Sequence, residues 1–295
     1  MQPPPADWRV GDETVRELLH RQLPAHADER LELVAEGFDA WIYRLGTKRA
    51  VRIPRRLLSA PKIRVEQEWL PLLAPRLPLP VPVPMLCGRP EPGIFEHPWT
   101  VSAWLPGEQV AGRAVAAAEA VRLADFLGSL HAPAPDEAPP NPFRDGSLGE
   151  RMADSMARAD RVRHAFPELA PLIGAAVDVL SSAADRDAFH PTWIHGDLHP
   201  FNLLASDSGI TGVIDWIDLT AGDPALDAHT VWWFWPEAEQ EPFWHTYPGN
   251  AALRHRARGW AVYFGLLFLD FGGGDAMWRD LATRILGHVT GSERG

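Results

Sequence analysis

The sequence predicts an α+β fold in which a small, β-rich lobe precedes a larger, mostly helical one. The chain has 295 residues, more than one small core needs. Short strand-like segments gather before residue 105, and helical patterns dominate after it. The turn residues Leu105-Pro106-Gly107-Glu108 mark the boundary. We therefore expect an N-lobe of residues 1–105 and a C-lobe of residues 106–295.

The N-lobe elements follow from apolar periodicity and from turn residues. Asp12 is expected to cap a helix that Pro24 ends, and a second helix follows Ser59. The proline-saturated stretch over residues 75–98 cannot be helix or central strand. Cys87 lies in this stretch and is expected to be buried. Strands are predicted over residues 31–36, 40–45, 50–53 and 99–104.

The C-lobe is expected to be built from helices around two short hairpins. A helix over residues 114–131 would bury Val121, Ala124, Leu127 and Leu130 on one face. Short apolar pieces at residues 193–194, 203–204 and 211–214 read as hairpin strands. Further helices are predicted over residues 147–164, 167–184, 251–270 and 275–289.

One polar loop in this hairpin region carries the chemistry. Asp197 and Asn202 have the Asp-to-Asn spacing of the kinase catalytic loop. In kinases that Asp accepts the proton of the attacking hydroxyl, and the Asn holds Mg²⁺. Asp215 ends the next strand, where a second metal-holding carboxylate would stand. One carboxylate and one amide suit Mg²⁺, which takes few protein oxygens beside phosphate and water.

The pattern H-G-D-x-H-P-x-N at residues 195–202, followed by I-D-W at 214–216, resembles the aminoglycoside phosphotransferase family. The resemblance implies a two-lobed, protein-kinase-like fold and phosphorylation of a small-molecule hydroxyl by ATP or GTP. It implies Asp197 as catalytic base, with Asn202 and Asp215 as Mg²⁺ ligands. Gly196 replaces the Arg of H-R-D, which indicates a site formed without a phosphorylation switch.

Nucleotide binding is assigned to the N-lobe. Arg52 ends an apolar strand where kinases carry a Lys, and the family resemblance includes V-R-x-P-R here. The alternative is a surface arginine on an edge strand. Helical geometry leaves both Glu66 and Glu68 open as its partner, whereas the family pattern E-x-x-W-L-P favours Glu66. By analogy with kinases, the backbone of Ala103 and Leu105 would bind the purine.

The acceptor is the least determined part of the function. Net charge of −11 suits a cationic acceptor, and equally a solubilising surface. Asp218, Glu237 and Glu239 are candidate acceptor ligands. The tryptophans around the two glutamates read either as an aromatic acceptor surface or as core, and we favour core. A macrolide, an amino alcohol or a metabolic sugar is an alternative acceptor, and nucleotide binding without turnover is an alternative function.

Composition excludes several other classes. The acidic charge argues against a nucleic-acid partner. A single cysteine and no signal-peptide pattern predict a soluble cytoplasmic protein. Residues 259–269 are too short to span a membrane. The sequence contains no Walker motif.

Overall fold

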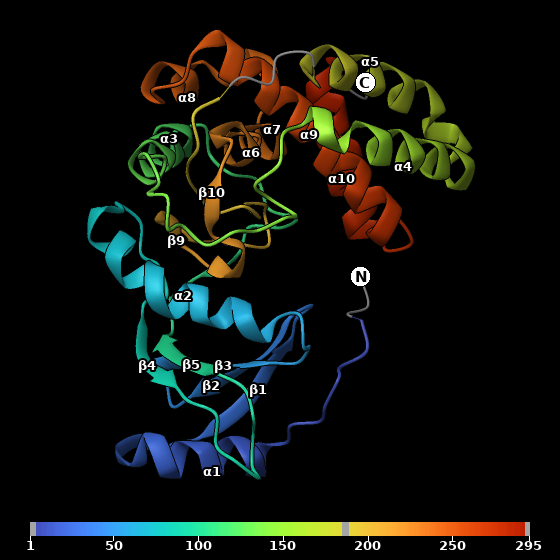
Figure 1. Ribbon diagram of the computed structural model, residues 1–295. Helices are drawn as coiled ribbons and strands as arrows, with labels where there is room; N and C mark the ends of the chain where they lie inside the picture. The colour runs from blue at the N-terminus through green and yellow to red at the C-terminus, as the bar shows by residue number, and fades with distance from the viewer. Residues whose placement is uncertain (1–3, 185–188, 293–295) are drawn as a thin grey trace. The chain divides into compact units, whose positions relative to one another are not determined.

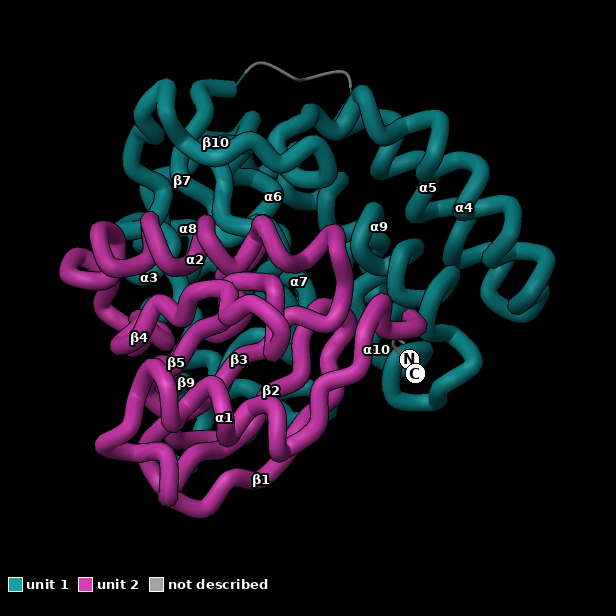
Figure 2. Tube along the Cα trace, turned by 60° about the horizontal axis from the view of Figure 1, so that its bottom comes forward, with its two compact units in different colours: residues 1, 108–210, 218–295 teal, residues 2–107, 211–217 magenta. Residues whose placement is uncertain are grey.

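A computed structural model of the protein describes residues 4–184 and 189–292. The chain forms two compact units (Figure 2). The first comprises residues 2–107 and 211–217, and the second comprises residues 108–210 and 218–295. The strands of the first unit and the helices of the second confirm the predicted α+β fold (Figure 1).

The first unit is a five-stranded antiparallel sheet of order β1-β2-β3-β5-β4. Helix α1 packs below the sheet and α2 above it in Figure 1. The predicted strands are present to within one or two residues. The elements are α1 Asp12–Gln22, β1 Leu31–Glu36, β2 Ala40–Leu45, β3 Arg49–Pro54, α2 Ala60–Leu73, β4 Pro84–Gly88 and β5 Trp99–Ala103.

Apolar side chains of α1 and of the strands fill the core of this sheet. Val15, Leu18 and Leu19 of α1 are fully buried against Tyr43 and Val51. Burial of large apolar side chains stabilises a fold by about 1.5–3 kcal/mol each. This core holds β3 and its polar residues in a fixed place.

Helix α1 ends just before Pro24, as predicted, and Pro24 begins a 3₁₀ turn, Pro24–His26. Two local expectations for the first unit need correction. Gly11, not Asp12, is the N-cap of α1. Cys87 is exposed, because it lies on β4 at the edge of the sheet.

The second unit is mostly helical. Its longest helix, α9, runs along its centre and is buried over most of its length. The elements are β6 Glu108–Gln109, α3 Glu119–Leu130, α4 Met152–Ala165, α5 Ala170–Ala184, β7 Thr192–Ile194, β8 Leu203–Ser206, β9 Gly209–Val213, β10 Thr220–Gly222, α6 Pro224–Ala228, α7 Val231–Phe234, α8 Glu241–Thr246, α9 Ala251–Gly272 and α10 Ala276–Thr290. Strand β9 begins in this unit and ends in the first.

Two expectations for the second unit are wrong in detail. Helix α3 begins at Glu119 rather than at residue 114, and Val121 is 41% exposed while Ala120 and Leu123 take the buried face. Strand β7 does not form a hairpin with β8. It pairs antiparallel with β10, for example through Ile194 and Thr220, because the loop over residues 195–202 leads the chain into another sheet.

Across the described residues, no single helix is long and apolar enough to cross a membrane. Two consecutive helical segments, Gly149–Ala165 and Pro167–Ala184, are together long and apolar enough, but the chain bends sharply between them. Both of these segments pack against the central α9.

Candidate active site

A carboxylate on helix α6 holds the loop that carries Asp197 in place. The Asp227 carboxylate accepts hydrogen bonds from the backbone N–H groups of His195 at 2.6 Å and Gly196 at 2.9 Å. His131 Nε2 lies 3.2 Å from the same carboxylate. Burial alone would raise the pKa of Asp227, but these contacts outweigh it and lower the pKa. A fully buried anion thus braces the loop.

Gly196 is required by the path of the loop. Its φ of 84° lies in the left-handed region, which glycine adopts without strain. A Cβ atom there would stand 2.6 Å from the carbonyl oxygen of Asp218 and 3.2 Å from Cγ of Arg144. The missing side chain leaves room for Arg144, which reaches this place from a distant loop.

Two side chains hold the Asp197 carboxylate. Arg144 Nη2 donates to Oδ1 at 2.7 Å, and His199 Nε2 lies 3.3 Å from Oδ2. Burial opposes ionisation of Asp197, but Arg144 and His199 outweigh it and hold its pKa well below the usual range. The carboxylate is therefore charged at neutral pH and fixed in direction. It suits a group that orients a hydroxyl and accepts its proton late in the reaction.

Asn202 lies beside Asp197 in the same loop. Its Nδ2 donates to the backbone oxygen of Asp197 at 2.9 Å and lies 3.4 Å from His199 Nε2. Both contacts use the amide nitrogen, which leaves Oδ1 as the atom suited to a hard cation. The structure thus brings together Asp197 and Asn202 within the second unit.

The first unit carries a separate charged cluster. Arg52 on β3 donates to Glu66 Oε2 at 3.4 Å and to the Asp215 carboxylate. The Arg52 side chain is only 12% exposed, and β3 is a central strand, so the alternative of a surface arginine on an edge strand is wrong. Burial opposes the charge on Arg52, but Asp215 and Glu66 outweigh it and raise its pKa.

Packing of α2 decides between the two glutamates. Glu66 is 1% exposed and faces Arg52, whereas Glu68 is exposed to solvent. Burial raises the pKa of Glu66, and the Arg52 charge only partly opposes this. Glu66 is therefore the residue that holds the guanidinium from the helix side.

Asp215 has an unusual backbone. It is the only residue other than glycine with a positive φ, 69°, in the described parts of the chain. Asp tolerates this region better than bulky residues do, and such conformations gather at functional sites. Its side chain is 38% exposed, which leaves the carboxylate accessible to a ligand. Within the described ranges, no group of three or more His, Cys, Asp or Glu side chains is arranged so that it could hold a metal ion.

The proposed purine-binding segment ends β5. Ala103 pairs with Arg49 of β3, while the pairing of β5 with β4 reaches only as far as Ser102. The N–H of Trp104 donates to the Lys48 carbonyl at 2.8 Å. The backbone of Ala103 and Leu105 therefore lies beyond Ser102, the last residue of β5 that pairs with β4.

The candidate acceptor residues lie in the second unit, and two of the three, Asp218 and Glu237, already bind other side chains. Asp218 is 7% exposed and accepts from Arg144 Nε and Asn141 Nδ2, both at 3.1 Å. Glu237 lies 3.5 Å from Arg254 and 3.9 Å from Arg258. Glu239 is exposed in the same 3₁₀ turn, Glu237–Glu239. The neighbouring tryptophans 232, 233 and 235 are at most 2% exposed, which confirms them as core.

Sequence reasoning missed Arg144 and Asn141. Both lie in a proline-rich loop without periodicity, 53 and 56 residues before Asp197. The sequence held one indirect signal. Gly196 stands where the kinase pattern has an arginine, and in the structure Arg144 places a guanidinium beside Asp197 instead.

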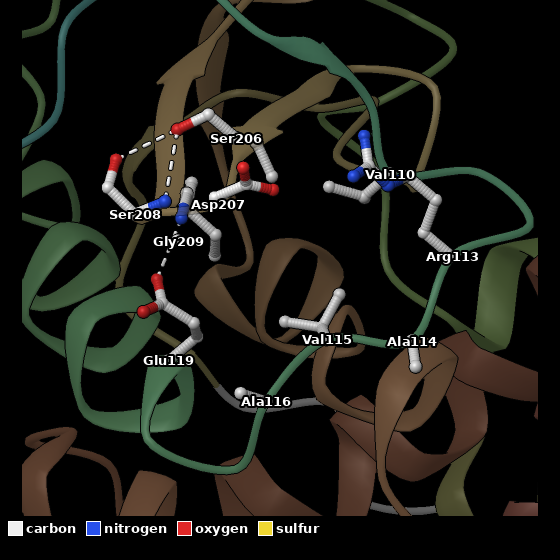
Figure 3. Close-up of a pocket in the computed structure, with 12 residues that line it drawn as sticks. Val110, Arg113, Ala114, Val115, Ala116, Glu119, Ser206, Asp207, Ser208 and Gly209 are labelled. Atoms are coloured by element: carbon white, nitrogen blue, oxygen red, sulfur yellow. Dashed lines mark hydrogen bonds between the residues drawn. The ribbon is translucent and has the colours of Figure 1, made fainter.

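A hollow of about 300 Å³ lies away from these residues (Figure 3). It is formed by the turn between β8 and β9 and by the segment that leads into α3. In Figure 3 the Glu119 carboxylate points to this turn, where it accepts from the Ile210 N–H at 2.8 Å. Asp197 and Asn202 do not line this hollow, so we assign it no part in the chemistry.

Comparison with known proteins agrees with this geometry. A sequence model described as the phosphotransferase enzyme family matches residues 30–262. The chain is 45% identical over 47 residues to the uncharacterized protein YcbJ of Bacillus subtilis (strain 168), a stretch that covers 15% of each protein.

Two solved structures share the fold at low sequence identity. The GDP complex of wild-type aminoglycoside 2′-phosphotransferase-IIIa has a TM-score of 0.69 and 19% identity, with 96% of this chain and 99% of that chain covered. The apoenzyme of macrolide 2′-phosphotransferase MphH from Brachybacterium faecium has a TM-score of 0.60 and 22% identity, with 93% and 97% covered.

Proposed function

We propose that this chain, which belongs to the phosphotransferase enzyme family, transfers the γ-phosphate of ATP or GTP to a hydroxyl group of a small molecule. The observation that carries the proposal is the state of Asp197. Its carboxylate is ionised, oriented by Arg144 and His199, and adjacent to Asn202. These properties suit a group that orients a hydroxyl and accepts its proton late in the reaction.

We assign the residues predicted to bind the metal and the nucleotide the following roles in this reaction. Asn202 and Asp215 would hold Mg²⁺, which supplies positive charge for the phosphate oxygens when bound. Arg52, fixed by Glu66, would bind the nucleotide phosphates, because its planar fork pairs with phosphate and carboxylate together. The backbone of Ala103 and Leu105 would bind the purine edge. Catalysis then rests on positioning and on charge complementarity.

Two acceptor classes are supported by the comparisons. An aminoglycoside is favoured by the likeness to the aminoglycoside 2′-phosphotransferase and by the net charge of −11. A macrolide is favoured by the likeness to the macrolide 2′-phosphotransferase. A cytoplasmic location belongs to the same proposal and is supported by the single cysteine. Antibiotic resistance would follow only if the acceptor is an antibiotic.

The test is release of nucleoside diphosphate from Mg-ATP and Mg-GTP in the presence of acceptor alcohols. We expect turnover that depends on the acceptor and is lost in Asp197→Asn, while nucleotide affinity stays the same. A fully active Asp197→Asn variant would remove Asp197 from the role of base. Lack of nucleotide binding in the wild-type protein would contradict the proposal as a whole.

A further inference from the structure

Arg144 connects the two carboxylates nearest to the proposed chemistry. Its Nη2 lies 2.7 Å from Asp197 Oδ1 and 3.1 Å from Asp218 Oδ2, and its Nε donates to the same Asp218 oxygen. The Arg144 side chain is 14% exposed. A guanidinium that binds two carboxylates at once fixes both of them, because its donors have a rigid planar geometry.

The surrounding loop is built to present this guanidinium. The Arg144 N–H donates to the Asn141 carbonyl at 2.8 Å, which closes a turn. The side-chain amide of Asn141 donates to the Asp218 carboxylate, so the loop is tied to the residue that Arg144 binds. The Arg144 guanidinium also stands 5.7 Å from the ring centre of Phe264, which is buried. Arg144 is thus held from three sides.

The same arrangement reduces the negative charge that would attract a polycation. Asp197 and Asp218 share one buried arginine, and Glu237 is paired with Arg254 and Arg258. Two carboxylates and one guanidinium leave one negative charge on this cluster in place of two. The fixed guanidinium beside Asp197 also repels an incoming ammonium group, and burial strengthens the repulsion.

Aromatic side chains accompany both the loop of Asp197 and the loop of Arg144. Phe201 follows His199 by two residues, and its ring stacks on Trp278 with centres 4.5 Å apart and planes 16° apart. Both rings are half-buried, and Phe143, next to Arg144, is 63% exposed. Partly exposed aromatic faces bind apolar and sugar-ring surfaces.

We propose that Arg144 is a positioning residue for Asp197 and that, by pairing Asp197 with Asp218, it makes the site select its acceptor more by shape and apolar contact than by multiple positive charge. The acceptor is then an alcohol with at most one positive charge and an apolar face. This proposal rests on the phosphotransfer proposed above.

The experiment compares three acceptors, an aminoglycoside with several ammonium groups, a macrolide with a single amine and a neutral glycoside, in the wild type and in Arg144→Gln and Arg144→Lys. We expect wild-type kcat/KM to be at least about tenfold lower for the aminoglycoside than for the better of the other two. Arg144→Gln should lower kcat for that acceptor by about 10- to 100-fold, because a misoriented base costs rate, with nucleotide Kd unchanged. It should also shift the kcat/KM ratio towards the aminoglycoside. Arg144→Lys, which keeps the charge, should recover part of kcat.

Arg163→Gln is the matched control, since the exposed contact of Arg163 is with Asp160 of its own helix, α4, at 3.0 Å. It should keep wild-type kcat and acceptor preference. Equal losses in Arg163→Gln and Arg144→Gln, or losses that follow only the folded fraction, would overturn the positioning role. A wild type that prefers the aminoglycoside would overturn the charge selection. A wild type that binds nucleotide but is silent with every acceptor would instead remove the proposed phosphotransfer, and this inference with it.

Discussion

Acidification should destabilise the second unit through His229. This residue is fully buried between α6 and α7. Its Nδ1 contacts the Leu226 carbonyl, and its Nε2 accepts from the Trp233 indole N–H at 3.1 Å. The neutral ring, with a hydrogen on Nδ1, satisfies both contacts. Protonation of Nε2 would leave the Trp233 donor facing another donor.

The magnitude follows from the pKa. Burial lowers the pKa of His229 from an ordinary 6.5 to about 4, and the contacts that oppose this are weaker. Because the folded pKa is lower than the unfolded one, the unfolded chain binds the extra proton, and stability falls as pH drops below 6.5. At pH 5 the loss is about 2 kcal/mol, and it approaches about 3 kcal/mol below pH 4, at about 1.4 kcal/mol for each unit of pKa difference.

Urea unfolding followed by tryptophan fluorescence at pH 7 and pH 5 measures this loss. Other groups titrate in the same range, so the comparison is between the wild type and His229→Gln, which keeps a donor and an acceptor but does not titrate. We expect the wild type to lose about 2 kcal/mol more than the variant between the two pH values. Equal losses in both proteins would refute the reasoning.

Three further changes test the site and its support. Arg256→Met should lower the unfolding free energy by about 3–5 kcal/mol, because the buried Asp223 carboxylate, which Arg256 binds at 2.8 and 2.9 Å, loses its partner. Adding Asp223→Asn to this variant should recover part of the loss, measured by urea unfolding. A loss below about 1 kcal/mol in Arg256→Met would contradict the prediction. Gly196→Ala should lower both Tm and kcat, since its Cβ would meet the Asp218 carbonyl at 2.6 Å; an unchanged kcat would show that the loop relaxes freely. Asp215→Ala should weaken Mg-nucleotide binding in calorimetry by at least about tenfold, and unchanged affinity would undo its assignment as a metal ligand.

Much of this protein is determined by local sequence. The strands of the first unit and the C-terminal helices follow from apolar periodicity and turn residues, which act over a few neighbours. Asp197 and Asn202 were found because both lie in one loop, five residues apart. Asp215 was found because it directly follows a strand that the sequence marks clearly.

The tertiary structure decided what depends on contacts between distant segments. Glu66 and Glu68 lie on the same helix, and only the packing of α2 against β3 shows which of them faces Arg52. The pairing of β7 with β10 joins segments separated by the whole catalytic loop. Arg144 comes from a loop without periodicity and reaches Asp197 only because Gly196 leaves space for it. His199 and Asn202 lie near Asp197 because they are close to it in the sequence, but the charge and direction of the Asp197 carboxylate also depend on Arg144, which only the fold brings there.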